Sequence, residues 1–398
     1  MDKKKTPTFT SRLPDVGTTI FTVMSALASE KKAINLGQGF PDFSCDRHLL
    51  EMVNEAMHQD QNQYPPMAGV SELRQEIAHK IKSIYRHQYD PVDEITVTAG
   101  GTQGIFTAVM CCVSPGDEVI VIEPAYDSYI PAIQMAQGVP IRVALEVKRG
   151  ALGKVESYQI PWKKIEGAIT EKTRLIMINS PHNPTGMIWK KEDLNHLADI
   201  VHGTEILVLS DEVYEHMVYD QKVHESVSSH PELVERSFVI SSFGKTYHVT
   251  GWKVGYVAAP KSMTSEFRKV HQFNVFTVNT PVQYGLSNYL KEQKHYLGLS
   301  NFYEKKRNFF QLGLRKTRFQ LLPSEGTYFQ CADYTGLNIP EAKLNESDFC
   351  CWLTSEIGVA AIPLSAFYTK GQESGVIRFC FAKQEKTLEE AITRLYKL

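Results

Sequence analysis

The sequence predicts an α/β fold, with a doubly wound and mostly parallel sheet followed by a smaller α+β domain. Short runs rich in Ile and Val recur along the chain, and patterns of helical period lie between them. These runs are almost continuously apolar, which is typical of strands buried on both faces of a parallel sheet. We expect such strands at residues 95–98, 118–122, 174–178, 205–210 and 237–241.

Between the expected strands, apolar residues repeat at the spacing of one helical face. One stripe consists of Leu73, Ile77, Ile81 and Ile84, and another of Ile105, Val109 and Cys112. The last hundred residues have a different pattern, with strands expected at 325–330 and 376–381. A final helix is expected to open with a capping box formed by Thr387 and Glu390.

The same patterns suggest a division of the chain into three parts. Residues 1–45 are expected to form an N-terminal arm that contributes to the small domain and to the active site. Residues 46–290 would form the large domain, and residues 291–398 the small C-terminal domain.

Composition and charge exclude several classes of protein. The 398 residues are 42% hydrophobic and 22% charged, which is normal for globular proteins and excludes a disordered or collagenous chain. The net charge of −2 favours neither nucleic acid nor an anionic membrane as a partner. No apolar run approaches the ~18 residues of a membrane helix, and no signal peptide is visible, so a cytoplasmic protein is expected. The seven cysteines include no C-x-x-C, which argues against a zinc site and a disulfide framework.

Residues suited to a ligand site follow the carboxyl ends of the expected strands, where open α/β sheets bind ligands. In chain order they are Gly101 with Thr102, Tyr126, Asn183, Asp211 with Tyr214, and Ser242 with Lys245. Glycine amides at a helix N-terminus favour an anion. A lysine of lowered pKa can form a Schiff base with an aldehyde, and a carboxylate beside a pyridine nitrogen keeps that nitrogen protonated. Together these properties describe pyridoxal 5′-phosphate.

In this hypothesis each part of the cofactor has its own residues. Asp211 would hold the ring nitrogen, and Tyr214 and Asn183 would bond the phenolic oxygen. The phosphate would be bound by Gly101, Thr102 and Ser242, with a charge supplied by Lys253.

Two other readings of the same residues are weaker. Gly244-Lys245-Thr246 resembles the end of a nucleotide-binding P-loop, but that motif needs a glycine where the chain has Val239. In a P-loop protein the lysine also precedes the acidic strand, whereas Lys245 follows it. A metal site could be built from Asp211, Glu212, Glu215 and His216, three of which would share a helix face. There is no H-E-x-x-H, however, and acidic residues are common at helix starts, so no metal is expected.

At this point the motifs resemble a known family. Ser242-Phe243-Gly244-Lys245-Thr246, followed by Gly251-Trp252-Lys253-Val254-Gly255, is similar to the lysine signature of class I aminotransferases of PLP fold type I. Further matching motifs are Gly37-Gln38-Gly39-Phe40-Pro41, Gln63-Tyr64-Pro65-Pro66, Asn183-Pro184-Thr185-Gly186 and Asp211-Glu212-Val213-Tyr214. The resemblance extends from about Leu13 to the C-terminus. It is strongest to methionine-preferring and kynurenine–oxoglutarate-type aminotransferases, through Thr18-Thr19-Ile20-Phe21 among others.

The resemblance implies roles for individual residues. Lys245 would bind the cofactor and move a proton, with Asp211 and Tyr214 completing the catalytic set. Tyr126 would stack on the ring, and Gln103 would join the cofactor-binding group. Arg378 would clamp the substrate carboxylate, helped by Gly39 and Asn183. The side-chain pocket would be formed by Ile20, Phe21 and Phe276.

The resemblance also implies a homodimer with shared active sites, in which Tyr64 reaches the phosphate of the neighbouring subunit. Two positions depart from the pattern of the family. Lys253 stands where many relatives have arginine, and a lysine supplies the positive charge but not the fork of donors that a guanidinium offers. Gln103 stands where close relatives more often have an acid.

The expected activity is a ping-pong transamination from an apolar, sulfur-containing or aromatic L-amino acid, such as methionine, phenylalanine, tyrosine or a glutamine-like donor, to a 2-oxo acid. A β-lyase acting on cysteine S-conjugates or cystathionine could use the same site. A non-catalytic regulatory module of this fold would carry an N-terminal DNA-binding domain, whereas only roughly 30 residues precede the first motif.

Overall fold

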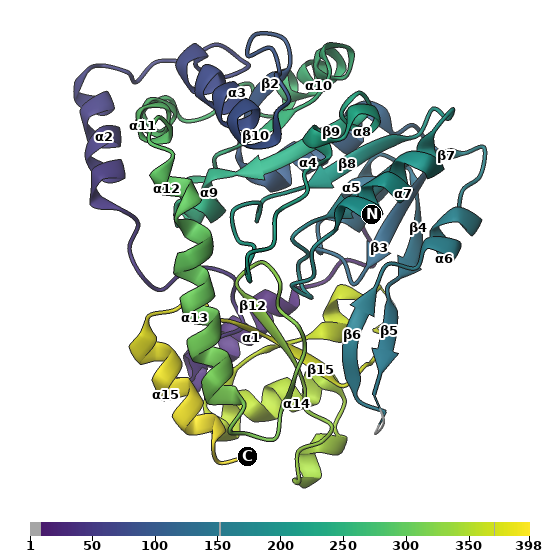
Figure 1. The fold of residues 1–398 in the computed structure, drawn as a ribbon, viewed down its shortest axis with the longest axis vertical. Helices are drawn as coiled ribbons and strands as arrows, with labels where there is room; N and C mark the ends of the chain where they lie inside the picture. Colours follow the sequence, from purple (N-terminus) through teal and green to yellow (C-terminus); the bar gives the residue numbers. More distant parts are fainter. Residues whose placement is uncertain (1–8, 151–152, 370) are drawn as a thin grey trace, which may run out of the picture.

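The computed structural model describes residues 9–150, 153–369 and 371–398, and its largest element is a seven-stranded sheet (Figure 1). The strands lie in the order β2 (Ile95–Thr98), β10 (Gly255–Ala258), β9 (Ser237–Ser242), β8 (Leu207–Asp211), β7 (Thr173–Asn179), β3 (Glu118–Glu123) and β4 (Val139–Ala144). β10 is antiparallel to both of its neighbours, and the other adjacent pairs are parallel. All five expected strands of this sheet are confirmed.

Both faces of the sheet are buried, as the continuous apolar runs predict. Along β7, Ile176 and Ile178 belong to the core under α3 (Ser71–Tyr85) and α7 (Lys191–Val201). The alternate residues Leu175 and Met177 belong to a second core, under α4 (Gly100–Cys112), α5 (Tyr129–Met135) and α10 (Lys261–Asn274). The alternation follows from the period of two along a strand. Both predicted helical stripes are confirmed, as α3 and α4.

A second, smaller unit is built on a four-stranded antiparallel sheet. Its strands lie in the order β11 (Gln320–Leu321), β12 (Phe329–Asp333), β15 (Val376–Cys380) and β14 (Ile362–Pro363). The helices around it are α1 (Ile20–Glu30), α13 (Leu299–Leu314), α14 (Glu346–Trp352) and α15 (Glu385–Leu395) (Figure 1). β1 (Ile34–Asn35) pairs with β13 (Val359–Ala360), so both ends of the described chain contribute to this unit. The exact boundaries given above stay a prediction.

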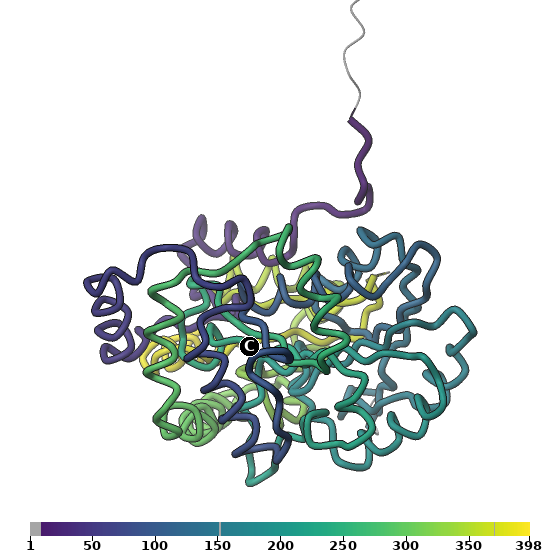
Figure 2. The backbone as a smooth tube through the Cα atoms, turned by 90° about the horizontal axis from the view of Figure 1, so that it is seen from above, coloured from purple at the N-terminus to yellow at the C-terminus, as the bar shows by residue number. Residues whose placement is uncertain are grey.

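A hairpin and several short helices complete the structure. β5 (Glu146–Arg149) and β6 (Val155–Gln159) form the hairpin, in which Val155 is buried in the core of the smaller unit. The remaining α-helices are α2 (Arg47–His58), α6 (Trp162–Gly167), α8 (Pro231–Val234), α9 (Phe243–Thr246), α11 (Thr280–Leu290) and α12 (Lys294–Leu297). Figure 2 shows that the described residues ahead of α1 extend away from the body, and Phe9 is 98% exposed.

Three local predictions are wrong. The strand expected at 325–330 begins only at Phe329, because the preceding residues turn and Thr327 has a φ of 64°. The last helix begins at Glu385, and Thr387 lies inside it, where its hydroxyl donates to Asp42 Oδ2 (2.7 Å) rather than capping the helix. The residues after Asp211 form turns and not a helix, so the helix face proposed for Glu212, Glu215 and His216 does not exist.

Two strands of the large sheet were not expected from the sequence. β4 contains a proline and an arginine and lies at the edge of the sheet with its residues mostly half exposed, so it lacks the continuous apolar pattern. β10 has only four residues. Within the described ranges, no helix has the length and apolarity needed to cross a bilayer.

The direction of β10 determines what gathers at the functional edge of the sheet. The parallel strands β3, β7, β8 and β9 end at one edge, together with β2, and β10 begins there because it runs the opposite way. Gly255 pairs with both Thr98 and Ser242. Lys253, two residues earlier, is thereby brought to the same edge as the residues that follow the other strands. A Cβ on Gly255 would lie 2.5 Å from Ser241 O, so the backbones approach too closely for a larger residue.

We therefore predict that Gly255→Ala destabilises the protein by about 2–3 kcal/mol, because the strands must separate to accommodate the methyl group. Urea unfolding followed by circular dichroism measures this change. Gly251→Ala is the matched control, since its Cβ would have no neighbour within 4 Å. Equal stability of the two variants would contradict the close packing at Gly255.

Candidate active site

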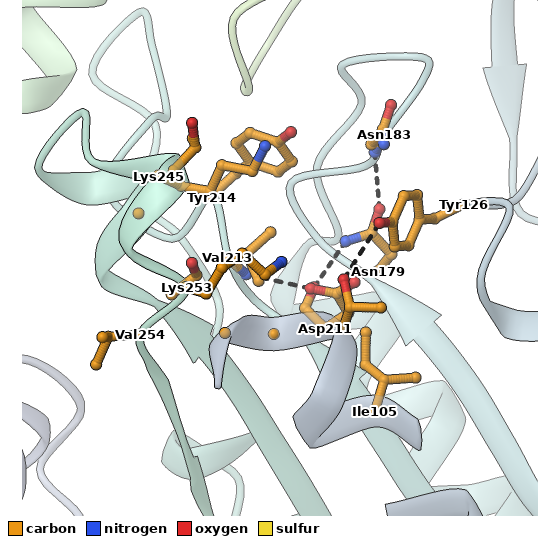
Figure 3. Close-up of a pocket in the computed structure, with 16 residues that line it drawn as sticks. Ile105, Tyr126, Asn179, Asn183, Asp211, Val213, Tyr214, Lys245, Lys253 and Val254 are labelled. Carbon is orange, nitrogen blue, oxygen red and sulfur yellow. Dashed lines mark hydrogen bonds between the residues drawn. The ribbon is translucent and has the colours of Figure 1, made fainter. Parts of the chain in front are cut away.

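A cavity of about 140 Å³ opens at the carboxyl edge of the large sheet (Figure 3). Nine of the residues predicted for the site line it: Gly101, Thr102, Tyr126, Asn183, Asp211, Tyr214, Ser242, Lys245 and Lys253. They come from segments that follow β2, β3, β7, β8 and β9 and from the segment that precedes β10. The strand ends thus bring together residues that are up to 152 positions apart in the sequence, from Gly101 to Lys253.

One end of the cavity is suited to an anion. The N-terminus of the 13-residue helix α4 opens there, and no side chain of its N-cap residue satisfies the first amides. A Cβ on Gly100 would lie 3.5 Å from Lys253 Nζ, which places the ammonium group beside this helix terminus. Ser242 contributes a hydroxyl from the end of β9. A positive charge, a helix N-terminus and a hydroxyl therefore meet at one point.

Asp211 also lines the cavity and is 4% exposed. Tyr129 donates a hydrogen bond to Asp211 Oδ2 (2.6 Å), and the Val213 amide donates to Oδ1 (3.3 Å). Asn179 holds the main chain through a bond to Asp211 O (2.7 Å), as Figure 3 shows. Burial raises the pKa of Asp211 to about 6, and these hydrogen bonds to Tyr129 and Val213 oppose that rise. Asp211 is therefore an anion at neutral pH, but one that is costly to keep buried without a positive partner.

Lys245 projects from α9 and is half-buried. Its Nζ donates to Tyr328 Oη (3.0 Å) and to Gly39 O (3.3 Å), so both partners are neutral oxygens. Burial lowers the pKa of Lys245 to about 8. A larger share of this amine is consequently unprotonated at neutral pH than for an ordinary lysine, which is the condition for nucleophilic and basic behaviour.

Arg378 is 1% exposed and extends from β15 toward the same region. Its guanidinium donates to Asn183 Oδ1 (2.5 Å) and Gly37 O (3.2 Å), and its buried Nε has no hydrogen-bond partner among the described residues. Phe329 and Phe367 lie beside it, with ring centroids 3.9 and 4.8 Å from the guanidinium carbon. A buried guanidinium whose partners are neutral can bind a carboxylate by donating two hydrogen bonds to it in bidentate geometry.

A second cavity of about 540 Å³ adjoins the first, because Tyr126 lines both. Ile20 and Phe21, predicted as pocket walls, line it, as does Phe367. Phe21 and Phe367 also pack beside the Arg378 guanidinium, so the second cavity lies on the far side of the rings that surround this arginine. Its charged residues are Asp15, Glu123, Asp127 and Arg142.

Three predicted site residues are not brought to the cavity of this chain. The Gln103 side chain accepts from Ala99 N (2.9 Å) and donates to Thr107 Oγ1 (2.6 Å), so it stabilises the start of α4 and does not line the cavity. Tyr64 is 84% exposed and packs edge-to-face with Phe276, which is 41% exposed. This pair of rings lies on the protein surface, and the roles assigned to both residues stay predictions. Gly39 contributes its carbonyl oxygen to the Lys245 site.

Sequence reasoning missed Tyr129, Asn179 and Tyr328. Asn179 directly follows the strand expected at 174–178, but of the two amides in that turn only Asn183 is assigned a role from the sequence. Tyr129 begins α5 three positions after Tyr126, and an aromatic residue at a helix start gives no signal of a bond to a carboxylate in another strand. Tyr328 lies just before β12, at a position where the sequence predicts a strand instead of a turn.

The acidic residues beside Asp211 are occupied by protein partners. Glu215 accepts hydrogen bonds from Lys80 Nζ and Tyr85 Oη (each 2.6 Å). Glu212 accepts from Ser210 Oγ and contacts His224 Nε2 (each 2.8 Å). In the part of the chain that the structure describes, no group of three or more His, Cys, Asp or Glu side chains is arranged to hold a metal ion.

Comparison with known proteins places this geometry in a family. The family model described as aminotransferase class I and II matches residues 31–395. The chain is 47% identical over 389 residues to the methionine aminotransferase of Escherichia coli K12, with 98% of each chain covered. It is 33% identical to the human kynurenine–oxoglutarate transaminase 1, with 93% of each chain covered. The chain belongs to the class I and II aminotransferases, and it is an enzyme of the transaminase type.

Solved structures agree with this assignment. A crystal structure of the Escherichia coli protein with methionine aminotransferase function matches with a TM-score of 0.94 and 46% identity, covering 99% of this chain and all of that one. A Thermus thermophilus aspartate aminotransferase with maleate matches with a TM-score of 0.86 and 26% identity, covering 98% of this chain and all of that one. The expected aspartate aminotransferase-like fold is confirmed. Enzymes of this family depend on pyridoxal 5′-phosphate.

The raised pKa of Asp211 predicts a gain in stability when its charge is removed. The folded chain retains the proton up to about pH 6, whereas the unfolded chain loses it near the ordinary aspartate pKa of 3.8, so stability falls as pH rises between these values. Asp211→Asn should therefore stabilise the cofactor-free chain at pH 8 by about 2–3 kcal/mol and lose this advantage near pH 4. Urea unfolding at the two pH values measures it. Asp199→Asn, on the exposed face of α7, is the control, and a pH-independent difference would contradict the interpretation.

Proposed function

We propose that the chain binds pyridoxal 5′-phosphate in the first cavity and transfers the amino group of an apolar, sulfur-containing or aromatic L-amino acid to a 2-oxo acid. The observation that carries this proposal is the presence of both Lys245 and Asp211 in the lining of one cavity. An amine of lowered pKa and a buried carboxylate face a space that has an anion-binding helix terminus at its other end.

The donor set suits the cofactor at three points. The uncapped amides at the start of α4, Ser242 and Lys253 match a phosphate. Asp211 is anionic at neutral pH and matches a protonated ring nitrogen, which would also provide the positive partner that this buried carboxylate lacks. Tyr214 and Asn183 offer further polar groups to the cavity, and Tyr126 offers a ring for stacking.

The bound cofactor would supply an electron-accepting ring that stabilises negative charge at the substrate Cα. Residues of the protein would hold the cofactor, move protons and exclude water. Lys245 would hold the cofactor before the substrate arrives, and its released Nζ would then move a proton from the substrate Cα. Asp211 would keep the ring nitrogen protonated, and Tyr129 would keep Asp211 ionised by donating to Oδ2. Tyr126 and the phenylalanines around Arg378 would exclude water from the reacting atoms.

Arg378 is our candidate for the substrate carboxylate. Its hydrogen bonds to Asn183 and Gly37 fix the guanidinium in place, and the partnerless Nε leaves a donor for a ligand oxygen. Because Phe21 and Phe367 line the second cavity and also pack on Arg378, a substrate held there would extend its side chain toward that cavity. Ile20 adds to the proposed apolar surroundings, whereas Phe276 lies outside this cavity and its part in the pocket stays a prediction.

The charges of the second cavity favour uncharged side chains. Its carboxylates are Asp15, Glu123 and Asp127, against the single cation Arg142, which lies 3.8 Å from Glu123. Glu123 also accepts from Thr369 N and Oγ1, whereas Asp127 is half-buried and its pKa is raised by burial. A second carboxylate on the substrate would be repelled there. The methionine aminotransferase of Escherichia coli, at 47% identity, supports methionine as the first donor to test.

We further propose a homodimer. Tyr64 and Phe276 form an exposed aromatic pair on the surface, and the described part of the N-terminal arm extends away from the body (Figure 2). A second copy of the chain would cover these features, and Tyr64 would reach the partner's phosphate site. A β-lyase reaction remains the alternative on the same residues, because removal of the same Cα proton can be followed by loss of a β-substituent.

The Lys245→Ala variant tests the proposed function. After incubation with the cofactor and reduction with borohydride, the wild-type peptide that contains Lys245 should carry the added mass, and the variant should carry none. The variant should also lose at least about 10³-fold of the methionine half-reaction, because the base and the anchor are one amine. Lys163→Ala, on the exposed surface of α6, is the control. Labelling of another lysine would refute the assignment, and release of ammonia and a 2-oxo acid from a thioether substrate without an acceptor would favour the lyase.

The Asp127→Asn variant tests the substrate class. Removing this carboxylate should raise kcat/KM for glutamate by about tenfold while that for methionine changes by less than about threefold, because like charges no longer meet in the cavity. Steady-state kinetics with both donors measures the ratio, with Asp199→Asn as the control. An unchanged ratio would mean that Asp127 does not determine selectivity.

A further inference from the structure

We infer that Tyr328 is a positioning residue for Lys245, which holds the free amine in reach of the substrate after the cofactor has released it. This inference rests on the proposed function and goes beyond it, because no residue outside the first cavity has yet been given a part in proton transfer. It starts from one contact, in which Lys245 Nζ lies 3.0 Å from Tyr328 Oη.

The directions of the hydrogen bonds define what Tyr328 can do. Its hydroxyl donates to Gly39 O (2.5 Å), so the phenol oxygen is left to accept from the lysine. Gly39 O accepts from the same Nζ at 3.3 Å. The amine of Lys245 therefore donates to two uncharged oxygens, Tyr328 Oη and Gly39 O, which are also joined to each other by a hydrogen bond. A carboxylate in the same place would hold the ammonium form far more strongly and would make the lysine a poor base.

The ring of Tyr328 is held rigidly. It is fully buried, and the rings of Tyr214 and Phe329 lie against it with centroids 5.2 and 4.9 Å away. Its main-chain oxygen accepts from Phe381 N (2.9 Å), which ties it to the end of β15. Burial raises the pKa of Tyr328 well above that of an ordinary phenol, so the hydroxyl does not titrate in the working range. The oxygen thus offers a fixed point to a side chain that has four rotatable bonds.

This fixed point matters only when Lys245 is free. While the lysine holds the cofactor, its position is set by that bond. Once the substrate has replaced the lysine, Lys245 Nζ would accept the proton from the substrate Cα and then donate that proton to a second atom within its reach. The resulting ammonium can donate to Tyr328 Oη and Gly39 O without leaving the site. A mobile amine would lose orientation, and with it rate.

The chain offers a closely matched control. Tyr303 is fully buried in the same cluster, with its ring 5.6 Å from that of Tyr328, and its hydroxyl has no hydrogen-bond partner among the described residues. Tyr303→Phe therefore removes a hydroxyl from the same core without removing a contact to Lys245. Comparison with Tyr328→Phe separates the effect of the hydrogen bond from that of the packing.

The decisive kinetic experiment uses the loaded full-length enzyme and methionine, with hydrogen or deuterium at Cα. Tyr328→Phe should slow the single-turnover half-reaction by about tenfold and increase its deuterium isotope effect, because proton transfer becomes more rate-limiting. The apparent affinity for methionine should stay within about twofold. Tyr303→Phe should leave all three quantities within about twofold. A slower reaction with an unchanged isotope effect, or an equal loss in Tyr303→Phe, would overturn the inference.

A second measurement does not depend on turnover. In the cofactor-free chain, the pKa of Lys245 can be read from the pH dependence of its reductive methylation, followed by mass spectrometry of the Lys245 peptide. Tyr328→Phe should lower this pKa, because the phenol oxygen no longer accepts from the ammonium form. An unchanged pKa would overturn the contact. If the wild-type enzyme transaminates no donor, the proposed function fails, and this measurement still decides whether Tyr328 holds the lysine.

Discussion

The structure depends on one constraint, the meeting of strand ends at a single edge of the large sheet. Six strands run in the same direction and finish there, and β10 is reversed, so that it starts where they stop. Without that reversal Lys253 would lie at the opposite edge, and the start of α4 would face no positive charge. The close contact of Gly255 with Ser241 shows how tightly this arrangement is packed. The cavity is a consequence of strand direction more than of any single loop.

Around this edge the protein keeps three ionisable groups away from water with neutral partners. Asp211 is bonded to a phenol and an amide, Lys245 to a phenol and a carbonyl, and Arg378 to an amide and a carbonyl. Each group would be more stable beside an opposite charge, yet the two cations are not paired with the anion. The hydrophobic packing in the cores of both sheets offsets the free-energy cost of burying these charges. A ligand with a protonated ring nitrogen, an electrophilic carbon and a carboxylate would complement all three, which is the electrostatic basis of the proposed function.

Sequence patterns predicted most of the large sheet, because a strand buried on both faces is continuously apolar and a helix between strands shows its period. They failed where tertiary contacts decide the outcome. β4 is an edge strand, and Thr387 finds its partner in Asp42, 345 residues away, so neither leaves a local signal. The motifs identified nine of the residues that line the cavity. Tyr129 and Tyr328 act through another side chain, and only the folded chain shows which one.

The position of the smaller unit in the sequence determines when the residues of the site become available during translation. Arg378 belongs to β15, whose neighbours include β12 and β14, and the carbonyl of Leu36 accepts a hydrogen bond from Cys380 near the other end of the chain. Gly39 and Tyr328, which hold the lysine, also come from opposite ends of the described sequence. During translation, all strands of the large sheet, the last of which ends at Ala258, are therefore synthesised well before Arg378, the candidate for binding the substrate carboxylate. Arg378 lies 20 residues before the C-terminus, so a chain that stops before β15 lacks its candidate for binding the substrate carboxylate.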